Sequence, residues 1–393
     1  MNERAVPVRH ELRENLPDGA ARAAVHFRFY DNREKYLLFV TTTNEKATIA
    51  EQIGRELRFI HPRPPSLRIF DAGMGDGMVL SRVMRRLHRR FPTVPWFVVG
   101  KEISVEDVRL TLDKMPERFF EHPQMVVAIT NMYYSEAPAL RPRSPAEAVA
   151  WIEFELEGGS TEEFEAQIAA LLPRLPEVWR VRTSPTTGNP LRERPAVIVL
   201  YRKDQKLALD RVIPRPENDG HDYHLIIASQ PYRARASAAT KVRMVLAPLA
   251  RALAPGGRLV TVQSYGRDPG MAIIRGIWPD DDPFRTQRHE LLDVARTTLA
   301  QDGPPGLRYL AFDDQRALFR YALHTMATEV GESIGTSTLL AAWNAAVYVA
   351  QIEDERMTEA LATTRYLDVT RATLRRHGGL WFNDELFVIA RRA

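Results

Sequence analysis

Residues 67–77 join an apolar, strand-like run to a loop in which glycine occupies every second position. The run Leu67–Phe70 leads into Asp71-Ala72-Gly73-Met74-Gly75-Asp76-Gly77, and apolar residues at helical spacing follow from Val79 to about Arg90. Alternating glycines let the backbone turn sharply with almost no side-chain volume. The segment therefore predicts a strand–loop–helix unit whose helix N-terminus faces a flat, nucleoside-like ligand.

The spacing of these glycines separates two classes of ligand. A dinucleotide-binding loop has the pattern G-x-G-x-x-G, which would place its third glycine at position 78. Position 78 is Met, and the third glycine is Gly77. This shift, together with the acidic Asp71 that opens the loop, favours S-adenosylmethionine over a nicotinamide dinucleotide.

Apolar runs without alternation recur along the chain and are separated by helical patterns. Continuous rather than alternating hydrophobicity is typical of strands that are buried on both faces. Such alternation of strands and helices predicts an α/β protein with a doubly wound, mainly parallel sheet. The strands expected after Leu67–Phe70 lie at 96–99, 125–129, 223–228, 258–263, 307–312 and 386–389.

Two segments interrupt this alternation and suggest a division of the chain. Residues 141–220 predict an inserted βαββ subdomain, in which Ser160 and Glu163 form a capping box, and residues 314–376 predict a helical insertion on the substrate side. Residues 61–140, 221–313 and 377–393 then form the core. Residues 1–60 are a separate N-terminal segment whose helix, capped by Thr42 and Glu45, is a candidate lid over the ligand.

Several of these features occur together in one known superfamily. The loop Asp71–Gly77, the acid Glu102 after the second strand, the turn 254–257 and the closing strand stand in the order found in class I S-adenosylmethionine-dependent methyltransferases, and the chain resembles them over about 40–140, 221–313 and 380–393. The resemblance implies a seven-stranded sheet, S-adenosylmethionine as cofactor and methyl transfer as activity.

The candidate cofactor-binding residues follow from this resemblance and from their chemistry. Backbone at the loop glycines can approach the methionine part of the cofactor, the Asp71 carboxylate can accept from its ammonium, and the two oxygens of Glu102 suit the two ribose hydroxyls. Ile103 is placed to cover one face of the purine, and the residues after the third strand to meet the adenine amino group. The expected cofactor site comprises Asp71, Gly73, Gly75, Gly77, Glu102, Ile103, Asn131, Met132 and Ser229.

The methyl acceptor is expected at the end of the fourth strand. Ser229-Gln230-Pro231-Tyr232 resembles the (Asp/Asn/Ser)-Pro-Pro-aromatic motif of amino-group methyltransferases, although Gln230 replaces the first proline. The resemblance implies that side-chain and backbone oxygens accept from a substrate amine while Tyr232 stacks on the substrate. Ser229, Gln230 and Tyr232 are therefore candidate catalytic residues; an ordinary strand-to-helix turn is the alternative. His324 and Tyr232 are candidates for a general base, if one is needed.

Composition narrows the function classes. The chain has no Cys, which excludes disulfides and thiolate sites, and Asp280–Asp282 do not have the separated ligands of a metal site, so no metal is expected. The net charge of +4 comes from basic residues scattered among acids, which favours a small-molecule substrate over a nucleic acid. Two arginines, Arg233 and Arg235, would suit an anionic substrate.

The predicted protein is a cytoplasmic, soluble methyltransferase of small molecules with a leaning to nitrogen. Two alternatives stay open: a methyltransferase of RNA, DNA or protein, and a non-catalytic relative that binds the cofactor and serves in assembly. The longest apolar stretch, Leu339–Ala350, is too short to span a membrane. A homodimer is compatible with the sequence.

Overall fold

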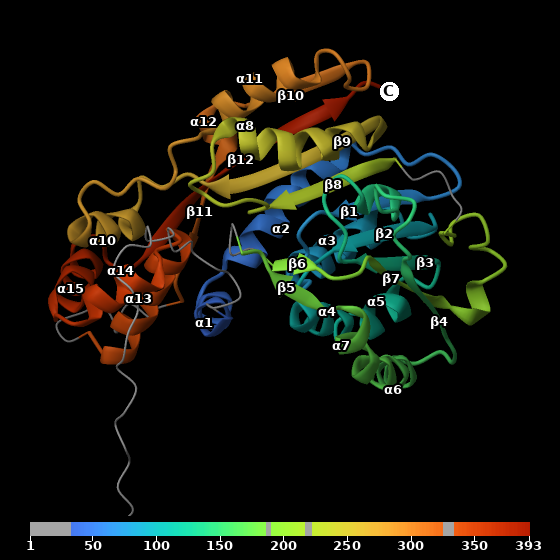
Figure 1. Ribbon diagram of the computed structural model, residues 1–393, viewed down its shortest axis with the longest axis horizontal. Helices are drawn as coiled ribbons and strands as arrows, with labels where there is room; N and C mark the ends of the chain where they lie inside the picture. The colour runs from blue at the N-terminus through green and yellow to red at the C-terminus, as the bar shows by residue number, and fades with distance from the viewer. Residues whose placement is uncertain (1–32, 186–189, 217–221, 325–333) are drawn as a thin grey trace, which may run out of the picture.

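A ten-stranded sheet with helices on both faces forms the centre of the protein (Figure 1). The computed structural model describes residues 33–185, 190–216, 222–324 and 334–393. The first 32 residues of the predicted N-terminal segment lie outside the described residues. No helix in the described ranges combines the length and the hydrophobicity that a membrane crossing requires. The cytoplasmic location and the homodimer stay predictions.

Seven strands of the sheet follow the predicted arrangement. Their order is β3-β2-β1-β8-β9-β12-β10, and β12 alone runs antiparallel to its neighbours in this set. The predicted fold class, a doubly wound and mainly parallel α/β sheet, is confirmed. The strands are β1 (Leu67–Asp71), β2 (Trp96–Lys101), β3 (Met125–Thr130), β8 (Tyr223–Ser229), β9 (Leu253–Ser264), β10 (Leu307–Leu310) and β12 (Trp381–Arg391).

Alternate residues of these strands feed two separate cores, one on each face of the sheet. Leu67 and Ile69 of β1 pack in the first core, whereas Phe70 packs in the second, because successive side chains of a strand point to opposite faces. The first core is covered by α2 (Glu45–Glu56), α3 (Met78–Arg90), α4 (Val105–Leu112), α5 (Met115–Glu121) and α6 (Thr161–Leu171). The second is covered by α8 (Ala238–Lys241), the π-helical turn Val242–Leu246, α9 (Ala247–Arg251) and α11 (Arg288–Leu299).

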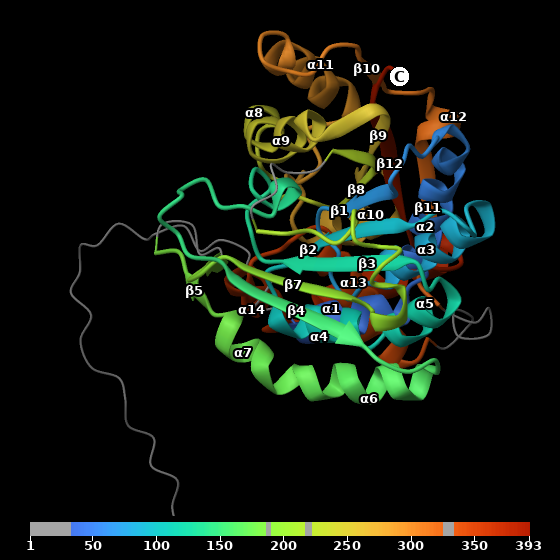
Figure 2. The same ribbon diagram turned by 90° about the vertical axis from the view of Figure 1, so that its right-hand side faces the viewer.

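The segment predicted as a separate βαββ subdomain belongs instead to the central sheet. Strand β7 (Ala196–Arg202) pairs antiparallel with β3, and β4 (Ala150–Leu156) pairs with β7, so both extend the sheet beyond β3 (Figure 2). The continuous apolar run of β7 is buried on both faces of the sheet, as is typical of a strand inside a sheet rather than at its edge. The predicted capping box of α6 is confirmed, and the small hairpin of β5 (Val181–Thr183) and β6 (Pro190–Arg192) and the turn α7 (Leu175–Val178) complete the segment.

The segment 314–376, predicted as helical, begins with a strand. After the short helix α12 (Asp314–Ala317), β11 (Leu318–Ala322) pairs with the half of β12 that β10 leaves free. Helices then follow as expected and form a third core with α1 and α10, gathered at one end of the sheet in Figure 1. They are α1 (Arg33–Thr42), α10 (Pro269–Ile277), α13 (Thr336–Val349), α14 (Asp354–Leu361) and α15 (Arg365–His377).

The junction between α1 and α2 differs from the predicted capping box. Thr42 is the last residue of α1, and its hydroxyl donates to the carbonyl of Leu38 at 2.6 Å. Asn44 precedes α2, but its side-chain oxygen accepts from the backbone of Ala322 in β11 at 2.7 Å. The predicted box is wrong because Thr42 lies inside α1 and its hydroxyl binds that helix. Asn44, which does precede α2, uses its side chain to bind β11. The sharp junction places Glu45 and Lys46, at the start of α2, close to the carboxyl ends of the strands.

Candidate cofactor-binding and active site

The glycine loop turns β1 into α3 as the sequence predicts. Gly75 and Gly77 both have positive φ, at +52° and +74°, and Gly77 caps α3. A Cβ on Gly77 would lie 2.6 Å from the Thr111 hydroxyl oxygen, whereas a Cβ on Gly73 would have open space around it. Gly77 is therefore required by the approach of α4, and Gly73 leaves room on the ligand side of the loop.

Glu102 is bound to the glycine loop. One carboxylate oxygen accepts from the backbone N–H of Gly75 at 2.9 Å, and the other accepts from Ile103 and Ser104 at 2.7 and 2.9 Å. The carboxyl ends of β1 and β2 thus bring together the two parts of the predicted site, which are 27 residues apart in sequence. Ile103 is half-buried beside the carboxylate.

The floor of the loop holds a buried acid with a shifted pKa. Burial raises the pKa of Asp71 to about 7, although the N–H of Gly73 and the ammonium of Lys46 act in the opposite direction. Burial lowers the pKa of Lys46, but nearby Tyr36 and Glu45 more than compensate, so that its pKa stands well above the ordinary value. Lys46 thus supplies a positive charge close to the loop that we did not predict from the sequence.

The turn after β8 is strained and closely held. Gln230 has a positive φ of +48°, and its amide bonds both to Ser264 and to Asp384, at 3.2 and 3.3 Å. The carbonyl of Pro231 accepts from the Tyr134 hydroxyl at 2.8 Å. The Gln230 side chain and the Pro231 carbonyl, both expected to bind a substrate amine, are therefore already hydrogen-bonded to protein groups. Ser229 is half-buried at the end of the strand.

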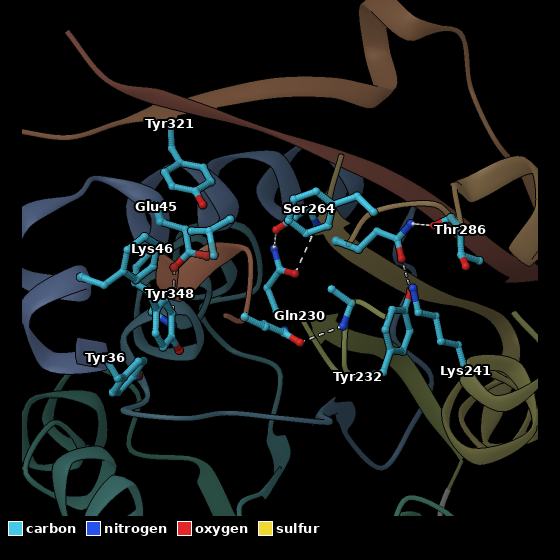
Figure 3. Close-up of a pocket in the computed structure, with 16 residues that line it drawn as sticks. Tyr36, Glu45, Lys46, Gln230, Tyr232, Lys241, Ser264, Thr286, Tyr321 and Tyr348 are labelled. Carbon is cyan, nitrogen blue, oxygen red and sulfur yellow. Dashed lines mark hydrogen bonds and ion pairs between the residues drawn. The ribbon is translucent and has the colours of Figure 1, made fainter. Parts of the chain in front are cut away.

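A cavity of about 80 Å³ opens beside this turn. Its lining combines the turn with α1, α2, the end of β9 and α13, as Figure 3 shows. The Tyr36 hydroxyl, which lines it, lies 3.3 Å from the position of a Cβ on Gly75. The cavity and the glycine loop are therefore adjacent. The lining residues are Tyr36, Phe39, Glu45, Lys46, Gln230, Tyr232, Ala234, Lys241, Gln263, Ser264, Phe284, Thr286, Tyr321, Tyr348, Val349 and Gln351.

One side of the cavity is acidic and has polar atoms without partners. Glu45 lines the cavity and is 5% exposed. Asp384 does not line it but accepts from the lining residue Gln230 and is fully buried, and burial raises the pKa of both carboxyls. Within the described structure, one Asp384 oxygen and the hydroxyls of Tyr36 and Tyr321 are buried without a hydrogen-bond partner. Buried polar atoms normally have hydrogen-bond partners in native proteins, so these three unpartnered atoms favour the presence of a bound polar ligand.

The opposite side rests on a buried hydrogen-bond chain. The Tyr232 hydroxyl donates to Gln263 at 2.7 Å, and the Gln263 amide donates to Glu385 at 2.6 Å. The Glu385 carboxylate also accepts from the Arg288 guanidinium and from its backbone N–H, both at 2.9 Å. This chain fixes the ring of Tyr232 at the cavity wall, where the Lys241 ammonium lies 4.9 Å from the ring centroid.

Comparisons with known proteins bear on the fold. No family model and no curated protein matches the chain. Among solved structures, it is similar to a geranyl diphosphate methyltransferase (13% identity, 87% of this chain and 77% of that chain, TM-score 0.32) and to the Haemonchus contortus phosphoethanolamine N-methyltransferase 2 (9%, 95% and 61%, 0.33). A third is the plantazolicin methyltransferase, at 9% identity over 92% and 91% of the two chains (TM-score 0.33).

Similarities this distant do not indicate an activity or a substrate for this chain. The strand order, with a glycine loop after β1 and an acid after β2, is the one implied by the predicted superfamily. The fold is a doubly wound, mainly parallel α/β sheet. The cavity lies at the carboxyl ends of the parallel strands, where ligands of open α/β sheets bind.

Two predicted adenine contacts have other roles in the structure. The Asn131 side chain is fully buried, donates to the carbonyl of Arg194 and accepts from the N–H of Ala196. The backbone N–H of Met132 is bonded to the Thr130 hydroxyl. Asn131 thus joins β3 to the chain entering β7, and the structure lends no support to its contact with adenine. The extra strand β7, which the sequence did not predict as part of the sheet, is the reason.

The structure does not support the predicted roles of His324 as a general base and of Arg235 in attracting an anionic substrate. His324 is exposed, and the residues that line the cavity do not include it, so its role as a general base has no structural support. The guanidinium of Arg235 binds the Asp281 carboxylate at 2.6 and 3.2 Å, which neutralises the charge expected to attract an anionic substrate. Asp281 also binds Arg356, and no metal-binding cluster occurs among the residues that the structure describes.

Lys241→Met is expected to raise the free energy of unfolding at pH 7 by on the order of 2–3 kcal/mol. Burial lowers the pKa of Lys241 from 10.5 to about 8, so folding disfavours its charged form. Between these two values the unfolded state binds more protons, and the stability of the wild type rises with pH relative to the variant. Urea unfolding of both proteins from pH 7 to 10.5 measures the difference; a constant difference would contradict the prediction.

Proposed function

We propose that this protein is an S-adenosylmethionine-dependent methyltransferase that acts on a small molecule. The observation that carries the proposal is the convergence of three features at one edge of the sheet. The glycine loop, the Glu102 carboxylate bonded to it and the cavity beside Gln230 adjoin one another. The cavity has a volume of only about 80 Å³, which supports a small acceptor over RNA, DNA or protein, since these would need a long groove.

The residues present fit the proposed cofactor. Gly73 and Gly75 leave backbone and space for its methionine part, and Asp71 and Lys46 supply opposite charges for its ammonium and carboxylate. Glu102 would exchange its present backbone partners for the ribose hydroxyls. S-adenosylmethionine supplies, when bound, a methyl group activated by its sulfonium. The protein then has to hold the acceptor in line with that group, which can lower the barrier by about 7–11 kcal/mol.

A nitrogen acceptor is supported by the acidic side of the cavity. Glu45 and the unpaired Tyr321 hydroxyl, which line the cavity, can accept hydrogen bonds from an amine and orient its lone pair. The carbonyl of Pro231 and the side chain of Gln230, held by Tyr134 and Ser264, would instead keep the turn rigid. We propose Tyr232 as the aromatic wall for the acceptor.

Calorimetric titration with S-adenosylmethionine and S-adenosylhomocysteine tests the cofactor site. Glu102→Ala is expected to weaken binding at least about 100-fold, since hydrogen bonds to a charged group contribute about 1.5–3 kcal/mol each. Glu106→Ala, an exposed acid on the adjoining helix α4, is the charge-matched control and should bind as the wild type does. Equal binding by Glu102→Ala and the wild type would contradict the assignment.

Transfer itself needs a second experiment. The protein is incubated with methyl-labelled cofactor and a metabolite extract, and label is expected in a small molecule that gains one methyl group on nitrogen. Label in RNA, DNA or protein would support the alternative substrate classes. Tight binding of the cofactor with no transfer to any fraction would support a non-catalytic, assembly role.

A further inference from the structure

Lys241 is a buried cation without a partner at the cavity wall. Its side chain comes from the end of α8, is 3% exposed and lines the cavity opposite Glu45 (Figure 3). The ammonium makes no hydrogen bond or ion pair with the residues that the structure describes; its contact is the face of the Tyr232 ring at 4.9 Å. A buried ammonium in this state is destabilising unless another group compensates it.

The neighbouring acids do not supply that compensation. Glu385 of β12 is the acid that raises the pKa of Lys241 most, but its carboxylate is already bonded to Arg288 and Gln263. Glu290 of α11 also raises the pKa of Lys241, and its side chain is exposed to solvent. The titratable hydroxyl of Tyr232 is bonded to Gln263. Burial outweighs these groups and lowers the pKa of Lys241 to about 8.

We infer that Lys241 binds a carboxylate of the methyl acceptor. The ammonium faces a cavity whose wall here includes the side chain of Thr286, so a ligand carboxylate would meet one positive charge and one hydroxyl donor. A single ammonium matches the single charge of a carboxylate better than the two charges of a phosphate monoester. Lys241 thereby becomes a specificity-determining residue.

This inference deepens the proposed function and rests on it. With the side of the cavity around Glu45 and Tyr321 proposed to hold a nitrogen, the acceptor would carry a nitrogen at one end and a carboxylate at the other. The two ends of the cavity then select opposite charges. A neutral or purely cationic amine would leave Lys241 buried and uncompensated, which discriminates against it.

The ammonium of Lys241 can be observed directly, because the chain has only seven lysines. Protein labelled with ¹³C at the lysine ε-carbon gives seven signals, and Lys241→Met and Lys101→Met identify two of them. Lys101 is the matched internal control: its ammonium lies 4.8 Å from the ring centroid of Tyr134, burial lowers its pKa, and it does not line the cavity. The signals are followed by pH titration of protein saturated with S-adenosylhomocysteine, in chloride, acetate, phosphate or methylammonium at equal ionic strength.

Acetate is expected to raise the titration midpoint of Lys241 by at least one pH unit over chloride and to leave that of Lys101 unchanged. Equal midpoints in acetate and chloride would overturn the inference, as would a larger shift with phosphate or with methylammonium. Loss of the acetate response when S-adenosylhomocysteine is added would assign Lys241 to the cofactor and also overturn it. If the protein binds no S-adenosylhomocysteine, the proposed function fails, whereas the acetate response without cofactor still tests the pocket.

Discussion

Glu385→Ala lowers the free energy of unfolding by about 3–5 kcal/mol, the expected cost of removing one partner of a buried ion pair. The side chains of Glu385 and Arg288 are 0% and 2% exposed, so the guanidinium left behind stays buried without its main counter-charge. The Gln263 amide also loses its acceptor, and the support of Tyr232 weakens with it. Urea unfolding followed by circular dichroism measures the loss.

The matched control for this prediction is an exposed pair. Glu51 and Arg55 form an i,i+4 pair on α2 with side chains 54% and 59% exposed, and Glu51→Ala should cost about 0.5 kcal/mol or less. Replacing both buried partners, by Glu385→Leu with Arg288→Met, should recover much of the stability, because no buried charge of this pair is left, and Asp314, the other partner of Arg288, is exposed to solvent. Equal losses for Glu385→Ala and Glu51→Ala would contradict the described network.

Gly77→Ala is expected to destabilise the protein by roughly 2–5 kcal/mol and to abolish cofactor binding at micromolar concentrations. The new Cβ would have to keep a φ of +74° and would lie 2.6 Å from the Thr111 hydroxyl oxygen. Either the start of α3 or helix α4 must then move. Both carry parts of the proposed cofactor site, so stability and binding should fall together.

Two variants separate strain from steric overlap at this position. Gly73→Ala, in the same loop, has no positive φ and no atom within 4 Å of its new Cβ, so it should cost little stability. Adding Thr111→Ala to Gly77→Ala removes the overlapping hydroxyl and should restore part of the loss. The prediction is wrong if the Gly73 and Gly77 variants unfold at the same urea concentration.

The sequence was informative wherever a local pattern controls the backbone. The glycine spacing predicted the turn from β1 into α3, and continuous apolar runs predicted strands that form the central sheet. Glu102 could be placed beside the loop from sequence because parallel strands end at the same edge. The turn and the position of Glu102 depend on contacts within the single β1–α3–β2 unit.

The errors concern interactions between distant segments. Nothing local to β7 indicates that it pairs with β3, and this pairing is what occupies the Asn131 side chain. The predicted capping box of Thr42 and Glu45 likewise fails, because the residue that precedes α2 is Asn44, whose side chain binds β11, 278 residues away. Lys46 and Lys241 carry no motif, and they matter because folding buries their charges beside one cavity. The one available signal was the scarcity of lysine in an arginine-rich chain.

Strand β12 has a consequence for how the protein is made. It pairs with β9, β10 and β11 and supplies Asp384 and Glu385, yet the ribosome synthesises it after every other described strand. Until it emerges, β9 has an unpaired edge and Arg288 has no buried counter-charge. The nascent chain can therefore assemble the cofactor loop early, but Gln263 and Tyr321 in the cavity wall lack their β12 partners until residues 381–391 are translated. A chaperone that shields the β9 edge would act in that interval.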